Sequence, residues 1–196
     1  MEMLRLFVAI NLPEELRASL TAAQRHLQRM LAEYPMRWSK PEGFHLTLKF
    51  LGDTESDRLD MIAQSLALVA ARHTPFELSV GGIGVFPNAR RPNVLWIGVH
   101  DEKHRLRHLA ADVDKAMAQL GWRREKRPFN GHLTLARVKK YAGGKDRRAL
   151  GETVAMVHGY DALGVLPVRS ISVMRSQLKP NGAIYTEVRV VDLQVG

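Results

Sequence analysis

The tetrapeptide His-Leu-Thr-Leu occurs twice in this chain, at residues 45–48 and again at residues 132–135. Apolar and polar residues alternate around both copies, which predicts a β-strand in each place. Side chains point alternately to the two faces of a strand, so each histidine shares a face with its threonine while the leucines point into a core. The fold must therefore present two matching strands, each with an imidazole and a hydroxyl on one face.

The repeat extends beyond the tetrapeptides, because strand, helix, strand and helix follow one another in both halves of the chain. In the first half these elements are predicted at residues 4–10, 16–31, 44–50 and 59–69. In the second half they are predicted at residues 94–99, 106–120, 132–135 and, with a weaker pattern, 150–157. We therefore expect two similar lobes that face each other across a groove.

The rest of the sequence predicts further strands and the turns between them. Strands are expected at residues 76–80, 171–173 and 184–190. The dipeptides at 52–53 and 81–82 predict breaks in their strands, and residues 179–182 predict a hairpin turn. Residues 141–148 combine two glycines with several cations, which predicts a mobile basic loop.

Composition excludes several classes of protein. A chain of 196 residues, 45% hydrophobic and 25% charged, is typical of a globular protein and not of a disordered one. The chain has no cysteine, which excludes disulfide scaffolds, thiolate metal sites and cysteine nucleophiles. Its apolar runs are too short for a membrane span, and its first residues do not read as a targeting signal. We expect a cytoplasmic protein without a membrane partner.

The charge balance favours a partner that carries phosphate. The net charge is +9, with a pI near 10.2, and arginines make up most of the 29 cations. The arginine fork matches pairs of phosphate oxygens and stacks on bases, so this surplus favours nucleic acid. A basic surface that only keeps the protein in solution gives the same count.

The paired histidines and threonines are suited to breaking a phosphodiester without a metal. Imidazole has a pKa near 6.5, so one histidine can accept a proton from water while the other donates one to a leaving oxygen. The threonine hydroxyls can donate hydrogen bonds to phosphate oxygens, on which negative charge grows during the reaction. A metal site is the weaker interpretation, because neither motif has a carboxylate or a third histidine at ligand spacing.

Three stretches of sequence resemble a known family. They are Arg-Leu-Phe-Val-Ala-Ile at 5–10, Phe-His-Leu-Thr-Leu-Lys-Phe-Leu-Gly at 44–52 and Gly-His-Leu-Thr-Leu-Ala-Arg at 131–137. Together they are similar to the 2H phosphoesterase superfamily, and within it to the RNA 2′,3′-cyclic phosphodiesterases, which are also called 2′-5′ RNA ligases. The likeness covers nearly the whole chain. It implies one domain over residues 1–196, with an α+β, bilobal fold.

In that fold, two pseudo-symmetric lobes with sheets rich in antiparallel strands surround a central groove, and the helices lie outside. The resemblance also implies an activity that needs neither a metal nor another cofactor. The substrate would be an RNA or oligonucleotide with a 2′,3′-cyclic phosphate end, which water opens to a 2′-phosphate. His45 would be the proton donor and His132 the proton acceptor, with Thr47 and Thr134 binding the phosphate. Run backwards, the same site would make a 2′-5′ linkage.

Two further residues are predicted at the site on a weaker basis. Arg137 is similar to an arginine that binds phosphate in the family, but strict alternation would place it on the face of the leucines. It reaches the groove only if the strand ends, twists or bulges there. Phe7 would stack on a base if the first strand neighbours the motif strand, although a core position suits it equally.

Other functions fit the same residues. The groove could serve small cyclic nucleotides or 2′-5′ oligoadenylates, or it could belong to a nucleotide-binding module without activity. We expect a monomer, because two lobes already complete one site.

Overall fold

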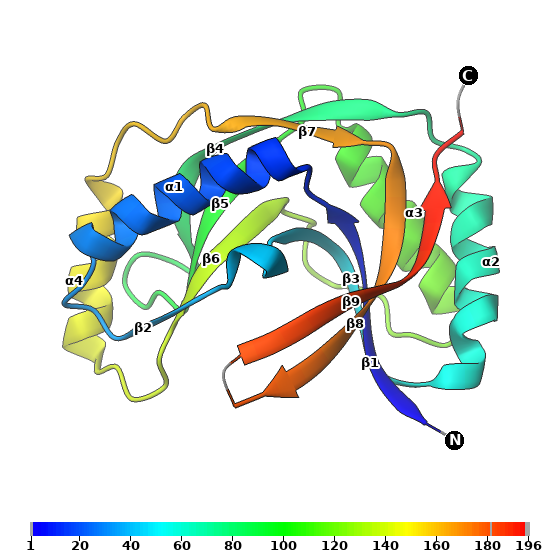
Figure 1. Ribbon diagram of the computed structural model, residues 1–196, viewed down its shortest axis with the longest axis horizontal. Helices are drawn as coiled ribbons and strands as arrows, with labels where there is room; N and C mark the ends of the chain where they lie inside the picture. Colours follow the sequence, from blue (N-terminus) through cyan, green and yellow to red (C-terminus); the bar gives the residue numbers. More distant parts are fainter. Residues whose placement is uncertain (1, 181, 195–196) are drawn as a thin grey trace.

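The computed structural model describes residues 2–180 and 182–194 (Figure 1). The first half of the chain forms β1 (Met3–Asn11), α1 (Glu14–Met30), β2 (Met36–Trp38), η1 (Pro41–Gly43), β3 (His45–Glu55), η2 (Ser56–Arg58), α2 (Leu59–Ala70) and β4 (Phe76–Phe86). The second half forms β5 (Val94–His100), α3 (Arg105–Gln119), β6 (His132–Val138), α4 (Gly144–Ala155), β7 (Gly164–Val168), β8 (Ser170–Lys179) and β9 (Gly182–Asp192). The predicted order of strands and helices in both halves is confirmed.

The strands form one curled sheet in the order β7-β4-β5-β6-β3-β1-β8-β9, with β2 beside β6, and every pair in the described chain is antiparallel. The first motif lies in β3 and the second in β6, at the centre of this order. These two strands are joined through the pair Leu46 and Leu133. The predicted α+β fold with antiparallel strands is thus confirmed, and its two lobes meet at the motifs.

We call the strands β3, β1, β8 and β9 the first lobe, and β6, β5, β4, β7 and β2 the second lobe. The helices lie on the outside of both lobes (Figure 1). Helices α2 and α4 cover strands of their own lobes, but α1 and α3 are exchanged: α1 leaves β1 and packs against β7, whereas α3 leaves β5 and packs against β3. Each half of the chain therefore supplies a helix that covers the other half.

Buried apolar side chains extend without interruption through both lobes. The leucines of the two motifs, Leu46, Leu48, Leu133 and Leu135, belong to this core. Their burial fixes the opposite face of β3 and β6 toward the groove, because a strand cannot turn one residue without moving its whole apolar set into water. No helix of the described chain combines the length and the apolar character that crossing a bilayer requires.

Two predicted strand breaks are wrong, because glycine allows each strand to continue through a bulge. Gly52 and Gly82 both have φ of +73°, and the pairing register shifts beside each of them. A left-handed residue within an antiparallel pair adds twist without ending the strand, and glycine adopts it without a steric penalty. Strands β3 and β4 therefore run on to Glu55 and Phe86.

The predicted mobile loop at 141–148 is also wrong. Helix α4 begins at Gly144, and Arg147 fastens its first turn to the neighbouring chain. The Arg147 guanidinium donates hydrogen bonds to the carbonyls of Pro92, Lys139 and Ala142. Several hydrogen bonds from one side chain offset the cost of ordering a glycine-rich segment. Of the predicted hairpin turn at 179–182, Asn181 lies outside the described residues; Lys179 pairs with Gly182 across it.

A bulge in β6 changes which side chains after Thr134 share a face with the second motif. Trp96 pairs with Thr134 and Leu95 with Ala136, so Leu135 has no partner in β5. Its carbonyl instead accepts hydrogen bonds from the Ser39 amide and from the side chain of Gln24 on α1, at 2.8 and 3.0 Å. Gln24 also donates to the carbonyl of Ser39. The exchanged helix therefore holds the bulge in place.

Replacing Gln24 with leucine should destabilise the protein by about 1–3 kcal/mol, because the buried carbonyl of Leu135 and the partly buried carbonyl of Ser39 each lose a hydrogen bond. Urea unfolding followed by circular dichroism would measure this loss. Gln28→Leu on the same helix is the control, and its effect should stay within about 0.5 kcal/mol. Equal stability of the two variants would contradict the role of Gln24 at the bulge.

Candidate active site

The two motifs place their polar side chains on one face of the sheet. Because Leu46 pairs with Leu133 in an antiparallel register, His45 is level with Thr134, and Thr47 is level with His132. The four side chains are partly exposed, whereas the leucines between them are buried. The structure thus brings together the four residues that the sequence predicted, as two imidazoles and two hydroxyls on the same face of β3 and β6.

Both imidazoles are held by the same kind of hydrogen bond to a backbone carbonyl oxygen. Nδ1 of His45 lies 2.8 Å from the carbonyl oxygen of Gly43, and Nδ1 of His132 lies 2.8 Å from that of Asn130. In each case the partner is two residues earlier in the chain. A carbonyl oxygen only accepts, so each Nδ1 carries a proton and each Nε2 is left to exchange one. The two histidines therefore have the same tautomer and the same reactive nitrogen.

Aromatic rings surround each imidazole. The His45 ring lies 4.6 Å from the ring of Phe7 and 4.9 Å from the ring of Tyr185 on β9, edge-on to the latter. The His132 ring lies edge-on to Phe86 at 4.9 Å and tilted at 6.4 Å from Trp96. These rings limit the rotation of the histidines and exclude water from one side of each.

The prediction that Phe7 stacks on a base is wrong. Phe7 is only 2% exposed, and the rings of His45 and Tyr185 cover it. No ring face is left for a base, because β1 lies between β3 and β8 and is buried on both sides. Phe7 instead supports the imidazole of His45.

Arg137 reaches the groove by means of the bulge in β6. Leu135 and Ala136 are both buried, so the alternation shifts by one residue and Arg137 is exposed on the side of His132 and Thr134. Its positive charge contributes to lowering the pKa of both His45 and His132, after the larger effect of burial. This is the arrangement that the sequence alone left conditional.

The same bulge occurs in β3 and brings a residue to the site that sequence reasoning missed. Val8 pairs with Lys49 and Ala9 with Thr47, so Leu48 is the unpaired residue here. Phe50 then occupies in the first motif the position that Arg137 occupies in the second, five residues after the histidine. Its ring is 67% exposed. The repeated spacing was the signal that could have found it.

The bulge also turns Lys49 away from the groove. Its ammonium group is buried against Asp114 of α3 and donates to the carbonyl of Arg123. Asp114 further accepts hydrogen bonds from Arg124 and from the amide of Glu125. These contacts lower the pKa of Asp114 against the opposing effect of its burial, which is the largest influence on it. They anchor the segment that leads to Asn130 and His132.

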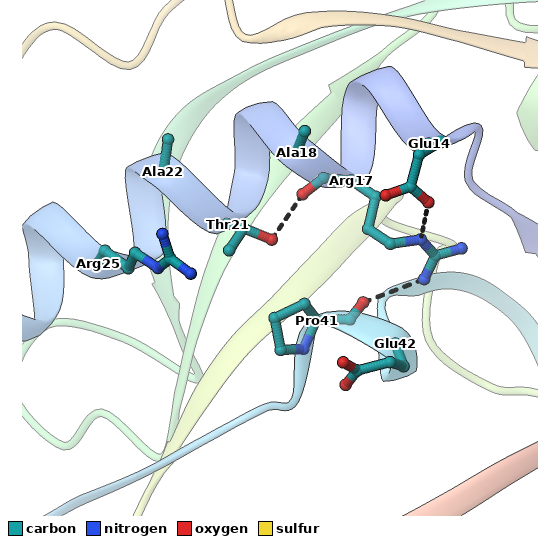
Figure 2. Close-up of a pocket in the computed structure, with 8 residues that line it drawn as sticks. All are labelled: Glu14, Arg17, Ala18, Thr21, Ala22, Arg25, Pro41 and Glu42. Carbon is teal, nitrogen blue, oxygen red and sulfur yellow. Dashed lines mark hydrogen bonds and ion pairs between the residues drawn. The ribbon is translucent and has the colours of Figure 1, made fainter.

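The other histidine is anchored from α1. Arg17 donates hydrogen bonds to the carbonyls of Pro41 in η1 and of Leu12, and it pairs with Glu14 (Figure 2). These contacts form one wall of a hollow between α1 and η1 that Thr21, Arg25 and Glu42 also line. Since η1 ends at Gly43, they fix the carbonyl that binds His45.

Within the described part of the chain, no three histidine, aspartate or glutamate side chains are grouped as a metal site requires. The donor set of the groove consists of imidazole, hydroxyl and guanidinium groups, which is a set for an anion.

Comparison with known proteins agrees with this geometry. The family model described as LigT like Phosphoesterase matches the chain twice, over residues 10–96 and 97–185. The chain belongs to the LigT-like phosphoesterase family. Each match contains one motif, so the family's own repeat coincides with the two halves described above.

Relatives of this phosphoesterase match over nearly their whole length. The RNA 2′,3′-cyclic phosphodiesterase of Methanothermobacter thermautotrophicus is 34% identical over 96% of this chain and 98% of its own. The protein of the same name from Archaeoglobus fulgidus is 34% identical over 96% of this chain and 100% of its own. A crystal structure from Thermus thermophilus superposes with a TM-score of 0.77 at 29% identity, covering 97% of this chain and 98% of the other.

Burial makes both imidazoles of the phosphoesterase hard to protonate. The pKa of His45 is lowered from 6.5 to about 4, mainly by loss of solvent; the hydrogen bond to Gly43 opposes this effect, and the charges of Arg137 and His132 add to it. The pKa of His132 is also lowered, again mainly by burial. Both rings are therefore neutral near pH 7.

Tyr185→Ala should raise the pKa of His45 from about 4 toward 6.5, because removing the ring admits water to the imidazole. Tyr185→Phe keeps the ring and should leave this pKa low. Histidine C2 proton shifts, followed by NMR between pH 3 and pH 8 in the absence of ligand, would report both values. An unchanged pKa in the alanine variant would refute the shielding role of Tyr185.

Proposed function

We propose that this phosphoesterase hydrolyses the 2′,3′-cyclic phosphate at the end of an RNA or oligonucleotide and leaves a 2′-phosphate. The observation that carries the proposal is the pair of imidazoles with the same Nδ1 anchor, interleaved with two threonines on one face of the sheet. The names of the relatives from Methanothermobacter and Archaeoglobus support the substrate. The excess of arginines supports a polyanionic ligand.

The proposed reaction is an in-line displacement at phosphorus. Nε2 of His132 takes a proton from water as the water oxygen attacks the phosphorus. The bond from phosphorus to the 3′ oxygen breaks, and that oxygen takes the proton from Nε2 of His45. Thr47 and Thr134 donate hydrogen bonds to the non-bridging oxygens, and Arg137 balances their growing charge. The products are a 2′-phosphate and a 3′-hydroxyl.

The negative charge of the bound phosphate would favour the protonated form of one histidine. A cyclic phosphodiester carries one negative charge, and an opposite charge within about 4–6 Å raises the pKa of an imidazole. The pKa of His45 is lowered to about 4 by burial, yet the resemblance makes this residue the donor. Substrate binding must therefore raise the pKa of His45, and the symmetry of the two anchors permits either histidine to start as the acid.

The same groove can run the reaction backwards. A 5′-hydroxyl in place of water would attack the cyclic phosphate and give a 2′-5′ linkage, with the two histidines in the same roles. Water is far more concentrated than an RNA end, so we propose hydrolysis as the main direction.

We also propose a monomer whose residues 1–196 form one domain in the cytoplasm; the continuous core and the exchanged helices support the single domain.

His45→Ala and His132→Ala should each lower kcat by about 10²–10⁴-fold on an oligoribonucleotide with a 2′,3′-cyclic end, because each removes one proton transfer. The exposed His158 provides the control, and His158→Ala should keep full activity. Phosphorus NMR of the product identifies which hydroxyl keeps the phosphate, and activity should persist in excess chelator. A 3′-phosphate product, or loss of activity in chelator, would refute the proposed reaction.

We propose that the terminal base of the RNA stacks on the ring of Phe50, because this residue is exposed beside the first motif. Stacking of a base on an aromatic ring contributes about 1–3 kcal/mol, so Phe50→Ala should raise KM by roughly tenfold or more. The value of kcat should stay within about twofold. Leu68→Ala, which removes an exposed apolar side chain from α2, is the matched control and should change neither constant.

A further inference from the structure

Two arginines lie side by side at the edge of the groove. Arg37 on β2 pairs directly with Arg137 on β6, and both side chains are exposed. Residues directly opposite in an antiparallel pair share a face and have Cβ atoms about 4.5–5.5 Å apart. Their neighbours Met36 and Ala136 are buried on the other face. Arg37 therefore points to the same side of the sheet as Arg137.

Neither of these two arginines has a carboxylate partner in the described chain. The eight ion pairs found there involve neither Arg37 nor Arg137, and neither guanidinium takes part in a side-chain hydrogen bond. Like charges directly opposite in a sheet are destabilising. The exposed Arg189, by contrast, has a carboxylate partner in Asp60. The pair is thus arranged for an anion from outside the protein.

The position of β2 indicates which anion this is. Strand β6 has β3 beside it at Leu133 and β2 beside it at residues 136–138, so β2 continues the line of β3 along the groove (Figure 1). Arg137 lies near enough to both histidines to lower their pKa values. Arg137 is three residues along β6 from Thr134, the residue level with His45, so its partner Arg37 lies further along the sheet than the two motifs. A second phosphate of the same chain would meet it.

We propose that Arg37 binds the phosphodiester that joins the terminal nucleotide to the rest of the RNA, and so makes the enzyme prefer oligonucleotides to cyclic mononucleotides. This inference rests on the function proposed above. The arginine fork holds phosphate oxygens in pairs, which gives Arg37 a role that lysine would fill only in part. Recognition of the linking phosphate is separate from the chemistry at the cyclic end, which His45 and His132 perform.

Three substrates isolate this contact. They are adenosine 2′,3′-cyclic phosphate, the diadenosine dinucleotide with a 2′,3′-cyclic end, and the same dinucleotide with an uncharged methylphosphonate linkage. Arg37→Gln should lower kcat/KM for the charged dinucleotide by about tenfold, because it removes one charge-assisted hydrogen-bonding partner. It should leave the other two substrates within about twofold. The change should appear in KM and not in kcat.

Arg148→Gln is the matched control, since Arg148 is exposed on α4 on the outer side of the second lobe. It should not change the ratio between the two dinucleotides, whereas Arg37→Gln should bring that ratio close to one. Arg37→Lys should recover part of the preference. Thermal unfolding of each variant shows whether the fold is intact.

The outcomes separate the two proposals. Equal losses on all three substrates, or no loss on any of them, would overturn the role of Arg37. A wild-type protein that cleaves the cyclic mononucleotide but does not distinguish the charged from the uncharged dinucleotide would also overturn it, while leaving the proposed hydrolysis intact. A wild-type protein that cleaves none of the three would refute the hydrolysis itself.

Discussion

The pairing of Leu46 with Leu133 is the contact on which the site depends. It is the place where the sheets of the two lobes join, and burial of the leucines on one side sets the orientation of everything on the other. A shift by one residue in either strand would turn its histidine and threonine into the core. The position of the reactive groups is thus fixed by apolar packing behind them, and only their fine orientation by hydrogen bonds.

That fine orientation comes from the backbone. The carbonyls of Gly43 and Asn130 hold the two imidazoles in the same tautomer, and each carbonyl is itself held from an exchanged helix. Arg17 on α1 grips η1 ahead of Gly43, and Asp114 on α3 binds the segment ahead of Asn130. Each histidine is therefore anchored by a helix of its own half of the chain that packs against the other lobe, so both lobes must be folded for both anchors to be in place.

Sequence periodicity predicted the motif strands, the major helices and the four central side chains, because burial of alternating or helically spaced residues leaves a direct trace in the sequence. It could not predict the bulges at Leu48 and Leu135. A bulge depends on which hydrogen-bond partners lie beside the strand, and here these are Ser39 and Gln24, far away in the chain. The positions of Phe50, Arg137 and Lys49 followed from the bulges. The burial of Phe7 depended likewise on strand order, and the three residues of β2 were too few to show a period.

The exchange of α1 and α3 suggests how such a molecule can arise. A single half would leave part of the outer face of its sheet uncovered, and two identical halves would complete the cover by swapping one helix each. Joining the two copies in one chain would preserve the swap and free the copies to diverge, which is the state in which the family's repeat is found here. Phenylalanine in one copy and arginine in the other, at the same distance behind the histidine, record that divergence. Two equal subunits joined in this way would become one polypeptide whose two sides are free to differ in the side chains that they present.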